Sequence, residues 1–258
     1  MNIETWIKIW RAGFIVSFFG VTQFVLCCII AMAQYPGGTM LDSTTTGYDL
    51  SENYLSDLGR EVALNNEPNP GRFLFNGSLV LLGICSLPFF MFMPTHAYDR
   101  TGWLILSAVI GTFAAVAIIC LGSYPCDLSP IAHFVALFVW LVAIFFASSI
   151  HAIALLTSKE TTSMFVSLVS VGVAMLAVAY LYNGTETVAA VVMHREIPLK
   201  AVLLQKLLGL ATLIWIFTIS LKLLLTADFS EFYPREVGED SESYLQSLEE
   251  DPWLPQRR

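Results

Sequence analysis

The stretch GWLILSAVIGTFAAVAIICL, residues 102–121, carries no charged side chain and decides the fold class. A helix needs about 20 apolar residues to cross the hydrocarbon core of a bilayer, which is about 30 Å thick. Of the 258 residues in the chain, 56% are hydrophobic and 13% are charged, whereas soluble domains carry roughly 25% charged residues. The sequence therefore predicts an all-α, polytopic integral membrane protein.

Five more blocks resemble this one, and together they predict a six-helix bundle. We expect the spans at residues 12–33, 73–93, 102–121, 131–156, 164–182 and 201–225. The connection over residues 34–72 is the longest. Residues 1–226 then form the transmembrane domain, and residues 227–258 form an acidic tail.

Positively charged residues near the spans indicate the orientation, because Lys and Arg are more frequent in cytoplasmic loops. The side that contains the N-terminus has Lys8, Arg11, Arg100, Lys159, Lys222, Arg235, Arg257 and Arg258, and the other side has Arg60, Arg72, Arg195, Lys200 and Lys206. We expect both termini in the cytoplasm and the long first loop on the outer face.

The charge balance bears on possible partners. Formal net charge is −8 and no run of Lys and Arg exists, so we do not expect a nucleic-acid partner. The acidic tail contains aromatic and leucine side chains between its carboxylates. It either stays solvated or docks on a cytoplasmic partner or on the bundle itself.

A periodic pattern in the first loop predicts a short amphipathic helix. Leu50, Tyr54 and Leu58 recur at every fourth residue, Ser51 can cap the start, and Gly59 can adopt the left-handed conformation that ends a helix. Small residues in the third block, Ser107, Gly111 and Ala115, predict close contact between helices.

Three short motifs carry a resemblance to known proteins: NYLSDLG at 53–59, FNGS at 75–78 and LLG at 81–83. The sequence resembles a family of bacterial and archaeal six-span proteins of unknown function, and it is similar to the Frag/DRAM/Sfk group of eukaryotic membrane proteins. The resemblance implies six helices with a structured first outer loop. It also implies a link to lipid organisation and membrane trafficking, and no particular reaction.

Polar side chains are expected to gather at the outer face. Asn53, Asp57, His133 and Lys206 frame the mouth of an expected crevice between helices, where they would bind the head group of an amphipathic ligand. For Lys206 and Lys222 we expect the side chains to reach toward the membrane interface. His151 is expected to pack between helices or lie at the interface.

Three functions remain open from the sequence. The first is a non-enzymatic protein that binds membrane lipids, or packs as an accessory subunit in a membrane assembly, and needs no cofactor. The alternative is a metal-dependent lipid hydrolase that uses Asp57, His133, Glu186 and His194, because His and carboxylate groups can hold a metal that activates water. The third is a small-solute transporter.

Overall fold

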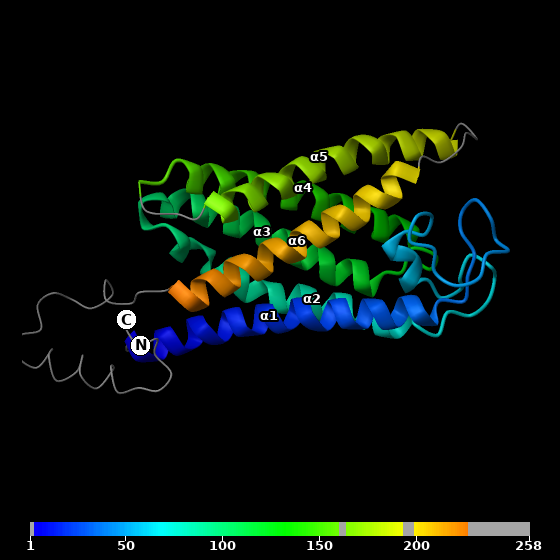
Figure 1. Cartoon of the computed structure of the whole chain (residues 1–258), viewed down its shortest axis with the longest axis horizontal. Helices are drawn as coiled ribbons and strands as arrows, with labels where there is room; N and C mark the ends of the chain where they lie inside the picture. Colours follow the sequence, from blue (N-terminus) through cyan, green and yellow to red (C-terminus); the bar gives the residue numbers. More distant parts are fainter. Residues whose placement is uncertain (1–2, 160–163, 193–198, 227–258) are drawn as a thin grey trace, which may run out of the picture.

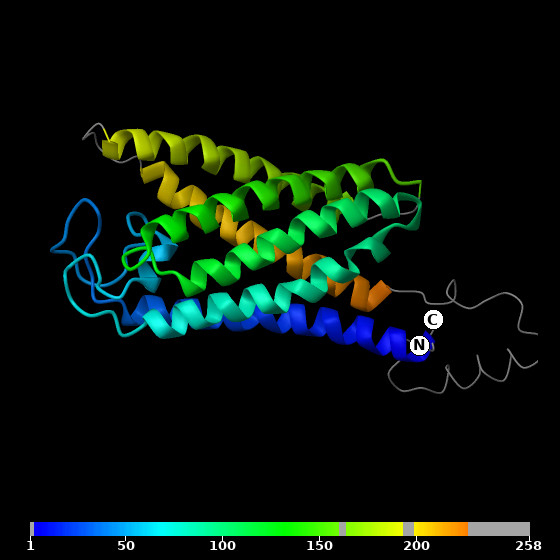
Figure 2. The same cartoon turned by 180° about the vertical axis from the view of Figure 1, so that it is seen from behind.

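Six long helices make up the part of the chain that the structure describes (Figures 1 and 2). The computed structural model describes residues 3–159, 164–192 and 199–226. The helices are α1 (Ile3–Gln34), α2 (Arg72–Phe92), α3 (Thr101–Ser123), α4 (Pro130–Leu156), α5 (Met164–Val192) and α6 (Leu199–Thr226). Three short 3-10 helices join them: η1 (Leu55–Gly59), η2 (Met93–His96) and η3 (Tyr98–Arg100). The acidic tail, residues 227–258, lies outside the described residues.

The helices form a closed ring in which each packs against the next along the chain, and α6 packs back against α1. α6 crosses the bundle obliquely in Figure 1. α1 begins and α6 ends at one end of the bundle, which we call the terminal end; η1 and the long first loop lie at the opposite end, the loop end. Which membrane face each end meets stays a prediction.

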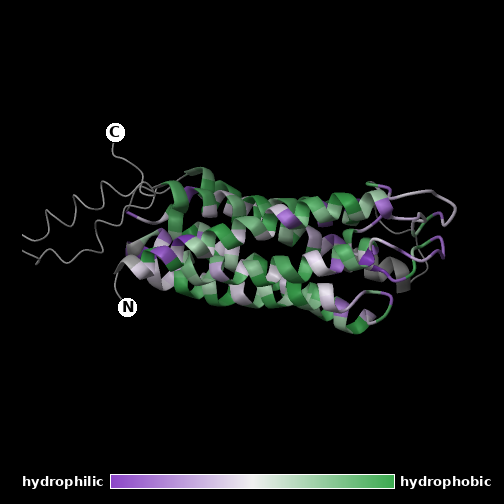
Figure 3. Cartoon of the chain, turned by 90° about the horizontal axis from the view of Figure 1, so that it is seen from below, coloured by the Kyte–Doolittle hydropathy of each residue, from purple (hydrophilic) through white to green (hydrophobic). Residues whose placement is uncertain are grey.

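Apolar side chains cover the outside of the bundle, and hydrophilic residues concentrate at its two ends (Figure 3). All six helices are long and apolar enough to cross a membrane. The protein is therefore an integral, multi-pass membrane protein with the six-helix bundle expected from the sequence. Two helices are longer than expected, because α1 begins at Ile3 and α5 continues to Val192.

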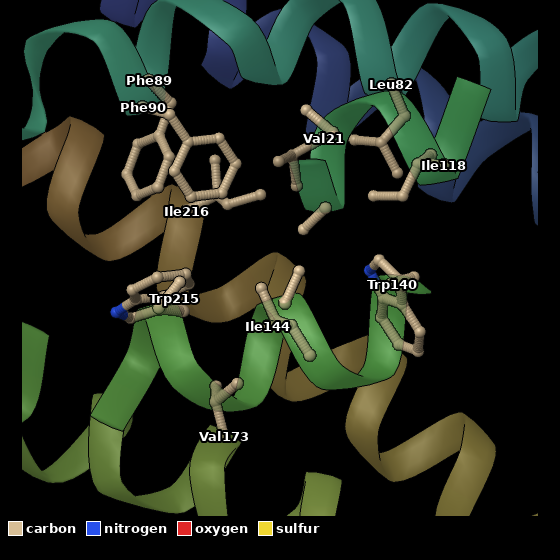
Figure 4. Close-up of a cluster of buried hydrophobic side chains, with 14 of the residues drawn as sticks. Val21, Leu82, Phe89, Phe90, Ile118, Trp140, Ile144, Val173, Trp215 and Ile216 are labelled. Atoms are coloured by element: carbon tan, nitrogen blue, oxygen red, sulfur yellow. The ribbon is translucent and has the colours of Figure 1, made fainter. Parts of the chain in front are cut away.

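Aromatic side chains fill the interior of the ring nearer the terminal end (Figure 4). The rings of Phe89 in α2 and Trp215 in α6 meet edge to face with centroids 5.5 Å apart, and Phe90 lies 6.2 Å from the same indole. Edge-to-face contacts of this kind stabilise a core beyond the effect of burial alone. They fix α6 against α2 across the centre of the bundle.

Small residues of α3 allow the close contacts expected from their spacing. A Cβ atom at Gly111 would lie 2.1 Å from the ring of Phe90, so α2 and α3 approach too closely for any larger residue. Ser107 donates a hydrogen bond from Oγ to the carbonyl oxygen of Ala147 at 2.7 Å, which joins α3 to α4. Packing and short polar contacts hold helices together in lipid.

The short helix of the first loop differs from the expectation. It is a 3-10 helix over Leu55–Gly59, not an amphipathic α-helix that begins near Ser51. Leu50 is 66% exposed, and Asp49 accepts hydrogen bonds from the backbone N–H groups of Ser51 and Glu52, which closes a turn there instead. Gly59 does not adopt a left-handed conformation. The recurrence of apolar residues at every fourth position does not mark an α-helix here, because Leu50 is exposed and only Leu58 is fully buried.

Candidate functional site

The 3-10 helix η1 is capped by its own acidic residue. The backbone N–H of Tyr54 donates to Oδ2 of Asp57 at 2.8 Å, and the Asp57 N–H donates to the Tyr54 carbonyl at 3.1 Å. Burial raises the pKa of the Asp57 carboxyl above its ordinary value, and the hydrogen bond from Tyr54 opposes that rise. Leu58, next in sequence, is fully buried. Asp57 therefore stabilises η1 while Leu58 anchors it in the core.

Asn53 and Lys206 fasten the loop to α6. Asn53 donates from Nδ2 to the carbonyl of Gly38 at 2.8 Å and to Asp57 Oδ2 at 3.4 Å. Lys206 donates from Nζ to the carbonyl oxygens of Leu50, at 2.8 Å, and of Asn53. Asn53, Asp57 and Lys206, three of the four residues expected to bind a head group, thus lie together. The polar atoms named here already form hydrogen bonds within the protein. The ammonium of Lys206 thus extends to the loop end and binds backbone carbonyl oxygens there.

Two asparagines connect η1 to the start of α2. Asn69 donates from Nδ2 to the carbonyls of Leu58 at 2.9 Å and Arg60 at 3.0 Å. Asn76, in α2, donates from Nδ2 to the carbonyl of Gly59 at 2.9 Å. The two motifs NYLSDLG and FNGS therefore meet in space and hold η1 on the loop end of the bundle.

Beside η1 lies a partly open, apolar cavity of about 110 Å³. η1 covers it through Leu55, Ser56 and Gly59. Helices α1, α2, α3, α4 and α6 contribute its walls, mainly with leucine, isoleucine and aromatic side chains: Phe24, Phe75, Leu79, Leu82, Ile118, Leu121, Leu137, Trp140, Leu213 and Ile216. Such a lining suits a hydrocarbon chain.

A few polar groups border this cavity. His133 donates from Nδ1 to the carbonyl of Tyr124 at 2.8 Å, since a carbonyl only accepts, and its neutral ring then keeps Nε2 as an acceptor. Gln205 accepts at Oε1 from the N–H of Leu55 at 2.8 Å, which ties η1 to α6. Both side chains are buried.

The indole N–H of Trp140 is the exceptional group of the cavity. It is buried and has no hydrogen-bond partner among the residues that the structure describes. Figure 4 shows Trp140 on α4, across the core from Leu82 and Ile118, two other residues of the cavity wall. Because a buried donor without a partner costs about 1–3 kcal/mol, it is a natural position for an acceptor from a bound molecule.

The residues named for metal chemistry are only partly described. Asp57 and His133 both lie at the loop end; His133 borders the cavity and Asp57 does not. His194 and the side chain of Glu186 lie outside the described residues. Among the side chains that are described, no group of three or more His, Cys, Asp and Glu could hold a metal ion. The metal-dependent hydrolase stays an untested prediction.

Trp140 and Gln205 were not predicted as site residues. Gln205 had a visible signal, since it is an uncharged amide within the last apolar block. Trp140 had none, because an indole inside a span fits ordinary packing. Only the position of the surrounding helices shows that its N–H lacks a partner.

The ring of helices and its partly open apolar cavity define a six-span membrane protein. Residues 20–225 match the family described as "Protein of unknown function (DUF998)", and the chain belongs to that family. No curated protein and no solved structure matches the chain.

Proposed function

We propose that this protein is a non-enzymatic binder of an amphipathic membrane molecule, whose hydrocarbon chain occupies the cavity beside η1. The apolar walls would surround the hydrocarbon chain of the ligand. Inside a bilayer, removal of that hydrocarbon from water contributes nothing to binding, because the surrounding lipid is equally apolar. The shape of the cavity and its polar contacts would therefore determine which molecule binds. The resemblance to the Frag/DRAM/Sfk group, which implies a role in lipid organisation, supports the same proposal.

The unpartnered N–H of Trp140 is the observation that carries the proposal. A ligand that places an ester, amide or hydroxyl oxygen near this nitrogen would satisfy it. His133 Nε2 can accept a hydrogen bond from a hydroxyl group nearer the loop end. The ligand class is therefore a single-chain or isoprenoid lipid with a neutral polar group.

The experiment compares molecules that co-purify with four variants in mild detergent, identified by mass spectrometry of the organic extract. Gly209→Leu fills the cavity, because a Cβ there meets only Leu55, at 3.6 Å. Trp140→Phe removes the donor and keeps an aromatic ring. Gly172→Leu in α5, where a Cβ meets nothing within 4 Å, and Trp103→Phe, at a half-exposed indole, are the matched controls.

We expect a specific lipid in the wild-type extract, a clear loss of it in Gly209→Leu and Trp140→Phe, and wild-type amounts in both controls. Thermal unfolding of each variant checks that the bundle is intact. Equal lipid content in all five proteins would contradict the proposal, since bound molecules would then only coat the outer surface.

A further inference from the structure

A second polar group of residues lies at the terminal end, far from the cavity covered by η1. It consists of His96 in η2, His151 in α4, Ser170 in α5, and Trp215 and Lys222 in α6. His96 and His151 are buried, and their ring centroids lie 5.2 Å apart with the ring planes 30° apart. Four elements therefore bring three bases and one hydroxyl together inside the bundle.

A continuous chain of hydrogen bonds joins these groups. Lys222 Nζ lies 3.2 Å from His96 Nε2, and His96 Nδ1 lies 3.1 Å from His151 Nε2. His151 Nδ1 lies 2.9 Å from Ser170 Oγ. Every ring nitrogen of both histidines thus has a partner.

The donor in each bond can be deduced from the serine outward. Ser170 Oγ donates to the carbonyl of Val166 at 2.8 Å, and it accepts from the indole N–H of Trp215 at 2.8 Å. With its only hydrogen engaged, Ser170 must accept from His151, so His151 carries its proton on Nδ1.

The remaining two bonds follow in the same way. Neutral His151 accepts at Nε2, so His96 donates from Nδ1 and accepts at Nε2 from Lys222. The chain then runs in one direction, from Lys222 through His96 and His151 to Ser170. It ends at the carbonyl of Val166, which can only accept.

We propose that Lys222, His96 and His151 form a proton-binding site that holds one excess proton in common. Lys222 gives a proton to His96 Nε2, and His96 passes its Nδ1 proton to His151 Nε2. The lysine becomes a neutral amine and His151 becomes an imidazolium, while His96 ends neutral with its proton on Nε2. Two transfers along existing hydrogen bonds thus move one positive charge inward, and no ring turns over.

The surroundings suit a single proton. Among the described residues, the titratable groups that face His96 are His151 and Lys222, and Lys222 also lies near His151. Ser170 and Trp215, from α5 and α6, are neutral. Each of the three titratable groups is a base. A second added proton would therefore put N–H donors on both sides of one contact, and the hydrogen bond at that contact would be lost. This inference goes beyond lipid binding and does not depend on it.

Nitrogen NMR of the full-length protein in lipid nanodiscs, with ¹⁵N in the histidine rings, tests the site. Near neutral pH we expect the proton on Nδ1 of both His96 and His151. As the pH rises, both rings should change along one common curve, because the site then loses the one proton that the three groups hold in common. A proton on Nε2 of His151 near neutral pH, or two separate curves, would overturn the proposal.

Variants then test the direction of the chain. Lys222→Gln keeps an N–H donor for His96 Nε2, so the Nδ1–H form of His96 should persist. Lys222→Met removes the donor, so the ¹⁵N shift of His96 Nε2 should move to that of an acceptor without a hydrogen bond, while the proton of His96 stays on Nδ1. In His96→Asn, the shared curve should disappear while lipid binding stays at the wild-type level. Identical histidine spectra in the Gln and Met variants would show that Lys222 does not belong to the site.

Discussion

Asn76 of α2 and Gly59 of η1 fit together so closely that no side chain can stand between them. The Nδ2 of Asn76 donates to the Gly59 carbonyl at 2.9 Å, and its Oδ1 lies 2.3 Å from the place where a Cβ of Gly59 would be. The two residues belong to two of the three motifs that carry the family resemblance. The contact holds η1 over the cavity, which gives a physical reason for the glycine and the asparagine at these positions.

Gly59→Ala should destabilise the loop end. The added methyl group must displace the Asn76 side chain or shift η1, and overpacking of this kind costs about 1–3 kcal/mol. Gly77→Ala is the matched control, because a Cβ at Gly77 meets nothing within 4 Å and alanine favours a helix. Thermal unfolding in detergent should show a lower Tm for the first variant only. A Tm for Gly59→Ala at or above that of Gly77→Ala would disprove the close contact.

Asn69→Ala should also weaken the attachment of η1. The substitution leaves the carbonyls of Leu58 and Arg60 without the donor they share, and each unsatisfied buried group costs about 1–3 kcal/mol. Asn65→Ala, which removes one bond to Glu67 in an exposed turn, serves as the control. We expect a larger fall in Tm for Asn69→Ala. Similar effects of both substitutions would show that Asn69 acts only as a turn residue.

The six-helix bundle could be predicted from the sequence because the length and hydrophobicity of each span can be read from that segment alone. The block at residues 102–121 needs no distant partner to reveal that it crosses lipid. The loop was predicted less well. Leu50, Tyr54 and Leu58 recur at every fourth residue, which indicates an α-helix. In the structure Leu50 is exposed, and Asp49 closes a turn at Ser51, so no α-helix forms there.

The candidate sites depend on contacts between residues far apart in the chain, which one sequence does not show. His96 and His151 are 55 residues apart, and Leu55 and Gln205 are 150 apart. Asn53, Asp57 and Lys206 were correctly expected near one another, because all three flank the same end of the bundle. The sequence does not predict that these side chains hydrogen-bond the loop backbone, because those bonds depend on which carbonyl oxygens of the loop lie near α6.

Asp57 predicts an unusual pH dependence. Burial raises its pKa in the folded protein, so its contribution to stability is present below its unfolded pKa and is lost as the pH rises through the raised value. Asp57→Asn removes that loss and keeps an oxygen that can accept from Tyr54. The Tm difference between the variant and the wild type should therefore shift in favour of the variant between acidic and neutral pH.

The contribution of Asp42 to stability should have the opposite pH dependence. Hydrogen bonds from Thr44 lower its pKa, so its contribution is present above the unfolded pKa and is lost as the pH falls through the lowered value. Asp42→Asn should be less stable than the wild type at neutral pH and should approach it in acid. If both substitutions changed the pH profile in the same direction, the buried position of Asp57 would be wrong.

Lys206→Met should loosen the loop without unfolding the helices. The ammonium holds the carbonyls of Leu50 and Asn53, and methionine keeps the apolar part of the side chain but donates nothing. Hydrogen–deuterium exchange should therefore rise in residues 49–59, because local opening there costs less free energy. Lys200→Met, at an exposed position near the start of the same helix, should leave exchange unchanged. Since η1 also covers the cavity, Lys206→Met should speed the loss of bound lipid. Faster exchange without faster lipid loss would mean that molecules leave between the helices rather than past η1.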